Sequence, residues 1–564
     1  SLGESPAQRA TRQRQAAATL EQTSWDRTAR SMQELIEQSW TARTEAKKSA
    51  AHPQGGPAVA TARPRSFPTI VIGAGPTGLS AAYHLGSDSL LLEAGSTVGG
   101  WCRSIVDRGF TFDHAGHIMF SNDPYVHEMY ATLLGSNVHW QNREAWIYSH
   151  DVYTRYPFQQ ALHGLPPDVL KECIVGAIEA RFGPLQEPSA QGARHGSNRP
   201  AALAGDPKAE SITDCCADGI AESTAPLLPF DKASRHARAE PQNFEEFIYR
   251  VWGAGVAKHF AVPYNRKLWA VPLSEMETSW LGGRVPLPDL EEMIEGALQP
   301  SAKPIGPNAR FGYPLRGGFQ ALMDGFLPLL EGELQLNARV VSVDASRRQV
   351  TLQDGRRYQY RQLISTMPLP QLVAMLSGDG LGPVREAAAR LRHVSVRCVN
   401  IGVARTDVTD KHWIYYPGDS VFHRIFVQGN ASPYCNAPGG FGLTCEITYA
   451  PSKPLPCEGD ELIDLCIRDC VRVGLLREDD RVVARNEIDM PYAYVVYDHA
   501  RAQNFKVVND WCARHDIILS GRYSEWQYYM SDHAFLAGRT AAERARSAEE
   551  DAARTRARPH EAAT

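Results

Sequence analysis

The sequence predicts an α/β fold in which a parallel-sheet domain is interrupted by a helical domain and by a domain with a mixed sheet. The chain has 564 residues, too many for one ordinary core, which indicates two or three domains. Strand-like segments dominate 69–157 and 308–375, helical ones dominate 161–300, and 380–515 mixes helices with long strands. A strand, glycine turn and helix beginning at Thr69 mark the start of the parallel sheet.

Composition narrows the functional classes. The hydrophobic fraction of 43% and the charged fraction of 22% are typical of a globular protein. A formal charge of −5 argues against a basic field that would recruit nucleic acid or an anionic membrane. No apolar run has the length of a membrane span, and no secretory signal is recognisable. Eleven scattered cysteines without a CxxC pair predict no metal site and favour the reducing cytoplasm.

Three segments are expected outside the main cores. Residues 1–68 form an N-terminal amphipathic helix, at about 20–47, followed by an Ala/Pro/Gly linker. Residues 184–240 are poor in large apolar residues and predict a long mobile insertion. The Ala/Arg/Glu-rich residues 547–564 predict a flexible tail.

The stretch "TIVIGAGPTGLSAAYHL" predicts a nucleotide-binding turn of the Rossmann type. Gly73 makes the tight turn, Gly75 lets backbone N–H groups approach a pyrophosphate, and Gly78 lets the helix pack on the sheet. The helix directs its positive N-terminal end at the pyrophosphate. Glu93 follows a second apolar strand, where a carboxylate can bind both ribose hydroxyls.

Further segments favour FAD over NAD. "STVGGWCRS", with Gly99 and Gly100, resembles the second fingerprint of the flavin family that includes amine oxidases, protoporphyrinogen oxidase and UDP-galactopyranose mutase. In that family, a segment like 336–368 returns to the FAD domain, with Val340 near the adenine and Ser365 near the pyrophosphate. The resemblance implies a discontinuous Rossmann-like FAD-binding domain over 69–160, 301–375 and 515–546, with a helical substrate and flap domain at 161–300 and a sheet-containing substrate domain at 376–514.

Much of the chain from Thr69 to Glu543 resembles UDP-galactopyranose mutases, especially the eukaryotic-type branch. The resemblance rests on "GFTFDHAGHIMFS", "RYPFQ", "HFAVPYNRKLWAVP", "SWLGGRVPLPDL", "GPNARFGYPLRGG", "HWIYYP" and "GRYSEWQYYMSDHAF". It implies an isomerase that interconverts pyranose and furanose forms of a UDP-sugar, such as UDP-galactose, with reduced flavin N5 as nucleophile and no net redox. NAD(P)H is the candidate reductant of the flavin, and a nucleotide-sugar is the expected binding partner. A homo-oligomer is possible, and the oligomeric state is left open.

The same resemblance assigns roles to individual residues. Arg284 and Arg424 match the arginines that bind the diphosphate, the first on a mobile flap. His117 matches the histidine beside flavin N5, Gly116 lets backbone approach the flavin, and Arg522 matches the arginine at the pyrimidine end. The residues that match the uridine, sugar and diphosphate pocket are Tyr156, Phe158, Gln159, Phe260, Asn265, Trp269, Asn308, Trp413, Tyr415, Tyr492 and Tyr528.

The pattern also departs from the family. On an ungapped count Tyr148 replaces an arginine upstream of "YPFQ", Ala431 replaces a tyrosine, and Ala115 replaces the first glycine of GGH. An asparagine after Tyr528 is missing from a shortened loop. These changes leave the sugar and the nucleotide open. An FAD-dependent oxidase acting on a small molecule is the alternative function, and a non-catalytic nucleotide-sugar binder is a third.

Overall fold

The structure is a computed structural model and describes residues 64–185, 240–282, 289–300 and 308–557. Contacts divide the chain into residues 1–63 and 64–564, and the description below concerns the second unit. The predicted N-terminal helix, almost all of the predicted insertion and Arg284 lie outside the described residues.

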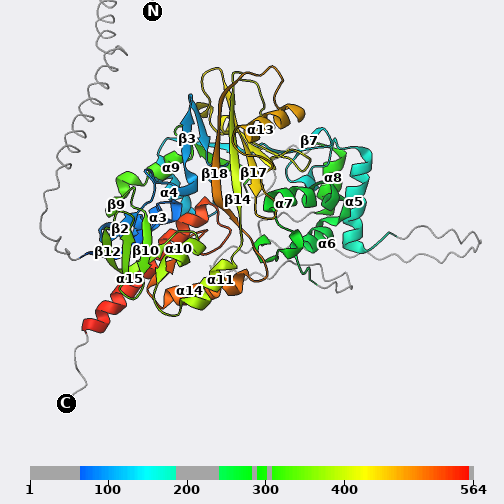
Figure 1. Ribbon diagram of the computed structural model, residues 1–564. Coiled ribbons are helices and arrows are strands. Elements are labelled where there is room, and N and C mark those ends of the chain that lie inside the picture. Colours follow the sequence, from blue (N-terminus) through cyan, green and yellow to red (C-terminus); the bar gives the residue numbers. More distant parts are fainter. Residues whose placement is uncertain (1–63, 186–239, 283–288, 301–307, 558–564) are drawn as a thin grey trace, which may run out of the picture. The chain divides into compact units, whose positions relative to one another are not determined.

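The first sheet has the strand order β13-β10-β11-β12-β1-β2-β9, and β19 pairs with β12 (Figure 1). Strands β19, β12, β1, β2 and β9 run parallel to one another, whereas β11 pairs with β12 in the antiparallel direction. The buried apolar runs of β1 and β2 are typical of parallel strands. The bounds are β1 Arg65–Ile72, β2 Ser89–Leu92, β9 Glu333–Gln335, β10 Val340–Asp344, β11 Gln349–Leu352, β12 Arg357–Ser365, β13 Leu376–Ser377 and β19 Ile517–Leu519.

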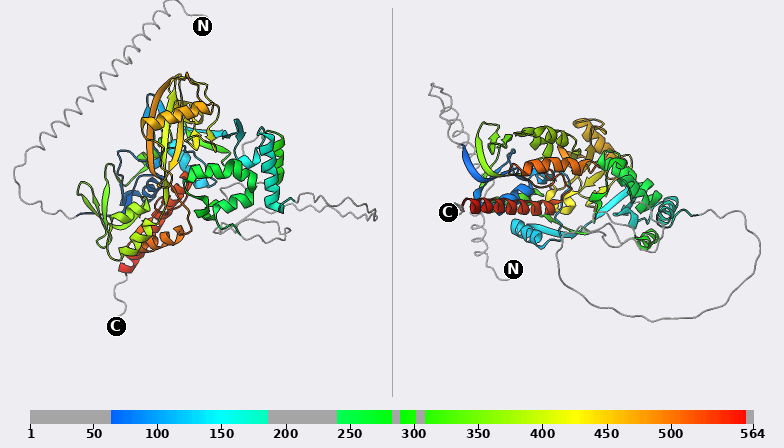
Figure 2. Two further views of the ribbon diagram at one scale, coloured as in Figure 1. Left: turned by 45° about the vertical axis from the view of Figure 1, so that its right-hand side comes forward. Right: turned by 90° about the horizontal axis from the view of Figure 1, so that it is seen from below.

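Helices from distant parts of the chain join this domain, namely α3 Pro76–Leu85, α4 Pro124–Leu134, α9 Gln320–Asp324, α10 Leu369–Met375, α11 Leu381–Ala389, α14 Arg501–Ala513 and α15 Ser531–Ala557. Helix α15 packs along α3 (Figure 2). The flexible tail predicted from Ser547 is wrong in part, because α15 continues to Ala557. Ala, Arg and Glu are strong helix formers, so the segment extends a helix that is already anchored.

The second sheet has the order β18-β14-β17-β16-β15-β6-β7. Its strands are β6 Ala145–Ser149, β7 Val152–Arg155, β14 His393–Val403, β15 Trp413–Tyr415, β16 Arg424–Phe426, β17 Phe441–Tyr449 and β18 Val482–Val495. The sheets therefore do not divide at residue 160 as predicted, because β6 pairs in parallel with β15. Helices α12 Gln428–Ala431 and α13 Asp460–Arg472 pack against this sheet. Two separate antiparallel pairs are formed by β3 Ser104–Asp107 with β4 Phe110–Asp113 and by β5 Val138–Asn142 with β8 Arg310–Pro314.

The helical region contains α5 Pro167–Phe182, α6 Phe244–Val256, a π-helical turn Ala257–Ala261, α7 Val262–Trp269 and α8 Leu290–Leu298. Helix α6 is interrupted within "WGAGVAKHF" at Gly253, whose φ is +83°. A Cβ on Gly253 would lie 2.2 Å from the carbonyl oxygen of Gly176, so glycine allows α5 and α6 to touch through their backbones.

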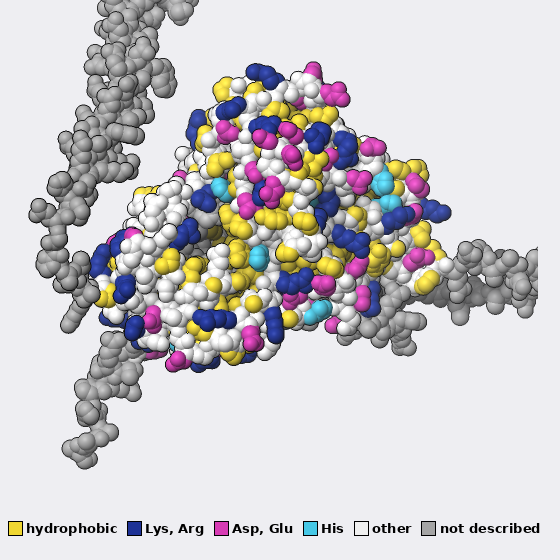
Figure 3. Space-filling model, viewed as in Figure 1, with side chains coloured by type: hydrophobic (Ala, Val, Ile, Leu, Met, Phe, Trp, Pro, Cys, Tyr) yellow, Lys and Arg dark blue, Asp and Glu magenta, His cyan; other side chains and the backbone are white. Residues whose placement is uncertain are grey.

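The surface carries both signs of charge. Figure 3 shows Lys and Arg side chains interspersed with Asp and Glu on the visible face. Among the described residues, no helix combines the length and apolarity of a membrane span. In the same part of the chain no group of three or more His, Cys, Asp or Glu is arranged to hold a metal ion, and the cysteines are free thiols.

Candidate functional site

The glycine turn lies at the carboxyl ends of the parallel strands. Gly73 has φ +97°, and a Cβ on Gly78 would lie 1.8 Å from the Gly73 carbonyl oxygen. Thr366, directly after β12, donates from Oγ1 to the carbonyl oxygen of Ile72 at 2.9 Å. The predicted segments around Gly73, Ser365 and Gly521 therefore meet at one edge of the sheet, where ligands of such folds bind.

The start of α3 is built to receive an anion. Its N-cap, Gly75, provides no side-chain cap, and the first turn has no acidic residue. A Cβ on Gly100 would lie 3.1 Å from Cα of Gly75, so the two glycine segments face each other closely. Glu93 accepts the N–H of Ala74 at 2.8 Å and of Gly95 at 2.7 Å, which fixes its carboxylate at the turn.

Arg522 supplies a half-buried positive charge at this site. Its Nη1 donates to the carbonyl oxygen of Tyr529 at 3.1 Å and its Nη2 to that of Ala493 at 2.8 Å. Its Nε is buried with no partner, and in the described part of the chain no carboxylate pairs with it. A buried cation without a counter-charge is costly unless a bound group compensates it. The electron-rich edge of a flavin fits that requirement, so these residues suit FAD.

His117 lies close to Arg522 and Arg424, which both act on its charge. Its Nδ1 donates to the carbonyl oxygen of Ala115 at 3.1 Å, and its ring stacks on Phe319 at 5.3 Å. Burial lowers the pKa of His117 to about 4. The ring is therefore neutral at pH 7, with Nε2 left as a hydrogen-bond acceptor.

The neighbouring loop explains two sequence features. A Cβ on Gly116 would lie 2.7 Å from Cγ of Phe426, so that ring already requires glycine, whatever the approach of the flavin. Ala115 has φ +68°, a left-handed conformation that suits the glycine expected there. Both residues therefore belong to a tightly constrained turn.

Asp113 holds in place Phe319, the ring on which His117 stacks. It is fully buried and accepts from Ser104 Oγ at 2.6 Å, Tyr313 OH at 2.6 Å and Phe319 N at 3.1 Å. Burial nevertheless raises the pKa of the Asp113 carboxyl to about 6. Its charged form is thus disfavoured in the folded protein.

We expect Asp113→Asn to change the pH dependence of stability. The folded pKa lies above the unfolded value of about 3.9, so the folded state binds more protons between roughly pH 4 and 6. Asp113 therefore costs stability as pH rises through 6, by about 3 kcal/mol at neutral pH. Urea unfolding of wild type and variant from pH 4 to 8 should show the wild type losing stability relative to Asp113→Asn. A constant difference across this range would contradict the shifted carboxyl.

Arg424, on β16, is paired with a buried carboxylate. Its Nη2 bonds Glu446 Oε2 and approaches Tyr494 OH at 3.3 Å, and Glu446 is 0% exposed. Burial alone would lower the pKa of the Arg424 guanidinium, but the charge of Glu446 outweighs this and raises it. Glu446 Oε1 also accepts the Gly116 N–H at 3.2 Å. Arg424 thus connects the loop of His117 with the second sheet.

The predicted aromatic residues gather beside Arg424. Tyr156 stacks on Tyr415 at 5.0 Å, and Phe158 stacks on Phe260 at 5.0 Å. Burial raises the pKa of Tyr156 to about 12. Other members of the predicted set are buried nearby or in contact with these rings: Gln159, Asn265, Trp269, Trp413 and Tyr528.

Arg143 was missed by sequence reasoning. Its Nη1 donates to Asn308 Oδ1 at 2.8 Å and its Nη2 to Tyr415 OH at 2.7 Å, and the guanidinium lies over the rings of Tyr156 and Trp413. Nowhere among the described residues does a carboxylate form an ion pair with it. Four predicted site residues thus surround an arginine with no counter-charge.

Two other residues singled out in the sequence have different neighbours from the set around Arg143. Tyr148 is partly buried and packs on Tyr153 and Tyr416, against the core of the second sheet. Tyr492 stacks on His393, whereas Tyr494 contacts Arg424 and stacks on Tyr528. Residues two apart on β18 share a face, so the pattern alone did not distinguish them.

The remaining predicted positions are part of the framework. Val340 begins β10, is buried and pairs with Leu352. Gly99 has φ +117°, next to the side chains of Arg103 and Met323. Ala431 is fully buried at the end of α12, and its carbonyl oxygen accepts from Gln141 Nε2 at 2.6 Å.

The fold and the site together resemble those of FAD-dependent enzymes, and the cofactor is FAD. Residues 71–133 match the model of an NAD(P)-binding Rossmann-like domain, and residues 275–545 match that of a flavin-containing amine oxidoreductase. The predicted α/β class and the predicted cofactor are confirmed.

Several solved structures are similar to this chain over most of its length. A reduced UDP-galactopyranose mutase is similar with a TM-score of 0.73 and 27% identity, over 86% of this chain and 96% of the other. A putative protoporphyrinogen oxidase from Exiguobacterium sp. 255-15 is similar with a TM-score of 0.59 and 14% identity, over 85% of this chain and 99% of the other. A putrescine oxidase variant is similar with a TM-score of 0.54 and 13% identity, over 86% of this chain and 100% of the other. The last two likenesses establish the fold alone.

Proposed function

We propose that this protein is a flavin-dependent mutase that interconverts pyranose and furanose forms of a nucleotide-sugar, with UDP-galactose as the reference substrate. The observation that carries the proposal is the assembly of Arg143, Asn308, Tyr415 and Tyr156 beside Arg424 and the loop of His117. A small amine needs no such pair of guanidiniums among stacked aromatic rings. The 27% identity to a UDP-galactopyranose mutase supports the same class.

Each residue has a role that follows from its chemistry. Reduced FAD, when bound, supplies a nucleophilic nitrogen to the anomeric carbon. Arg143 and Arg424 bind the diphosphate and stabilise the charge that grows on the departing nucleotide. Tyr156 and Phe260 present ring faces to the nucleoside. Neutral His117 accepts a hydrogen bond through Nε2 beside the flavin.

The proposal extends to partners and context. A UDP-sugar or a related nucleotide-sugar is the substrate, NAD(P)H is the proposed reductant, and the cytoplasm is the proposed compartment. Arg284 is proposed as a further diphosphate ligand. The amine oxidoreductase match over 275–545 favours the second candidate, an FAD-dependent oxidase of a small molecule.

Product analysis under two redox conditions tests these candidates. Oxidised and dithionite-reduced protein is incubated with UDP- and GDP-sugars without oxygen, and products are identified by chromatography and NMR. We expect a furanose product with the reduced protein only, with no net consumption of reductant. Turnover only of the oxidised protein, with oxygen or another acceptor consumed, would replace the mutase with the oxidase.

A further inference from the structure

The connection between β5 and β6 carries Arg143 and is only two residues long, so its conformation fixes where the guanidinium points. The backbone N–H of Arg143 donates to the carbonyl oxygen of Ala309 at 2.8 Å. The side chain then reaches Asn308 and Tyr415 from this anchored backbone. Any group that holds both ends of the connection controls the direction of Arg143.

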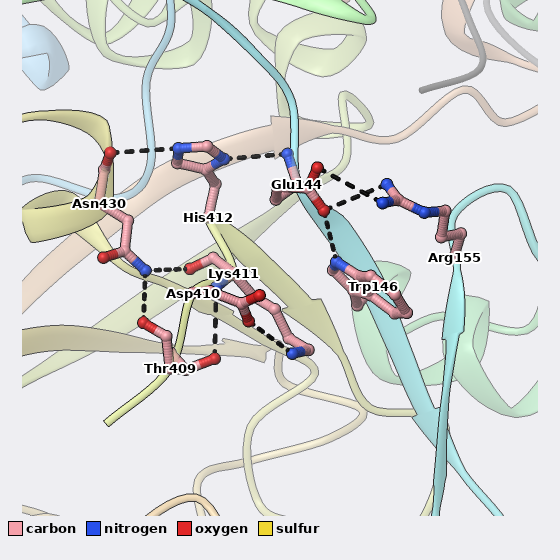
Figure 4. A network of polar contacts seen from close by, with 8 residues as sticks. All are labelled: Glu144, Trp146, Arg155, Thr409, Asp410, Lys411, His412 and Asn430. Carbon is pink, nitrogen blue, oxygen red and sulfur yellow. Dashed lines mark hydrogen bonds and ion pairs between the residues drawn. The ribbon is translucent and has the colours of Figure 1, made fainter. Parts of the chain in front are cut away.

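His412 holds both ends. Its Nδ1 accepts the backbone N–H of Glu144 at 2.9 Å, and its Nε2 lies 3.0 Å from Gln141 Oε1 and 3.1 Å from the carbonyl oxygen of Asn430. Figure 4 shows the ring between Glu144 and Asn430. Because Nδ1 accepts, Nε2 must carry the hydrogen and donate. The two ring nitrogens thus bond the residues on either side of Asn142 and Arg143.

The contact is reciprocal and buried. The carbonyl oxygen of Glu144 accepts the N–H of His412 at 2.8 Å and that of Trp413 at 3.1 Å, and His412 is 6% exposed. Phe311 packs edge-on against the imidazole at 5.1 Å. The ring therefore has one orientation, and it transmits that orientation to the Glu144 amide.

We propose that His412 is a positioning residue, which directs Arg143 into the candidate nucleotide-sugar site by bonding Gln141 and the Glu144 amide. The inference rests on the proposed function for the identity of the ligand that Arg143 meets. It adds to that function a residue that touches neither the substrate nor the flavin. The Nδ1 acceptor is the essential atom of the side chain, because it is the ring nitrogen that bonds the backbone next to Arg143.

Two substitutions separate the nitrogens. In His412→Asn, the amide oxygen takes the place of Nδ1 and keeps the acceptor for Glu144 N–H. In His412→Gln, the amide lies near Nε2 and that acceptor is lost. We expect UDP to bind His412→Asn within threefold of wild type and His412→Gln at least tenfold more weakly, measured by calorimetry on FAD-loaded protein. Equal affinities of the two variants would overturn the inference.

A double-variant cycle distinguishes positioning from general damage. In an Arg143→Ala background, His412→Gln should no longer weaken UDP binding, because the group it directs is gone. A further tenfold loss in that background would show that His412 acts through the fold and would overturn the inference. FAD content and thermal midpoint are recorded for every variant.

Hydrogen exchange decides the matter without a substrate. Peptides that cover 138–146 should exchange the Glu144 amide faster in His412→Gln and at the wild-type rate in His412→Asn. Unchanged protection in His412→Gln would refute the inference even if UDP binds. Conversely, failure of wild type to bind any nucleotide-sugar would refute the proposed function, while the exchange result would still judge His412.

Discussion

Gly78→Ala is expected to abolish stable FAD binding. The new Cβ would lie 1.8 Å from the Gly73 carbonyl oxygen, a backbone atom that cannot move without opening the turn. Because Thr366 and Leu92 bond the same turn, the strain would spread to the ends of three strands. FAD content after dialysis, read from the flavin absorbance, should fall at least tenfold.

Gly382→Ala is the matched control. Gly382 lies in α11, and a Cβ there would meet no atom within 4 Å. Because Gly382 lies in the first turn of α11, directly before Pro383, alanine is not expected to add stability there, but this variant should retain FAD. A fully yellow Gly78→Ala protein with wild-type stability would mean that the turn is built differently.

Arg424→Ala is expected to lose both turnover and stability. Glu446 would remain fully buried without its cation, which costs about 3–5 kcal/mol. Loss of the guanidinium that we propose to bind the diphosphate should lower turnover roughly 100-fold. Steady-state rates and urea unfolding of FAD-loaded protein measure the two effects.

A double variant separates these effects. Arg424→Met with Glu446→Gln removes both charges while the amide oxygen can still accept the Gly116 N–H. Stability should return towards wild type, because a buried ion pair can be replaced by neutral groups at little cost. Turnover should stay low, since no guanidinium is restored. Recovery of turnover in the double variant would exclude Arg424 from the reaction.

The parallel-sheet part of the fold was predictable because its signals are local. The strand, the glycine turn and Glu93 are contiguous, and each has a specific geometric reason in the structure. The placement of β6 and β7 was not predictable in this way. Their partner strand β15 lies more than two hundred residues away, and only the pairing of Ala145 with Trp413 reveals the sheet they join.

The aromatic residues of the candidate site were predictable from motifs, whereas two of its charged residues, Arg143 and Glu446, were not. Motifs found Tyr156, Tyr415 and Asn308, all of which contact Arg143. Arg143 itself stands in a connection whose length an ungapped count cannot establish. A search for an arginine at each length of that connection could have found it. Glu446, the partner of Arg424, lacks any motif and needed the strand pairing of β16 with β17.

The position of β19 bears on how the protein is made. This strand, at Ile517–Leu519, pairs with β12, and α15 then packs along α3, which begins at Pro76. A ribosome would therefore complete all the other strands of the first sheet before this last parallel strand emerges. Until then the edge of β12 is unpaired and the flavin pocket lacks Arg522. FAD capture should consequently follow the synthesis of Arg522, and chains that stall before residue 517 should be targets for chaperones rather than holders of cofactor.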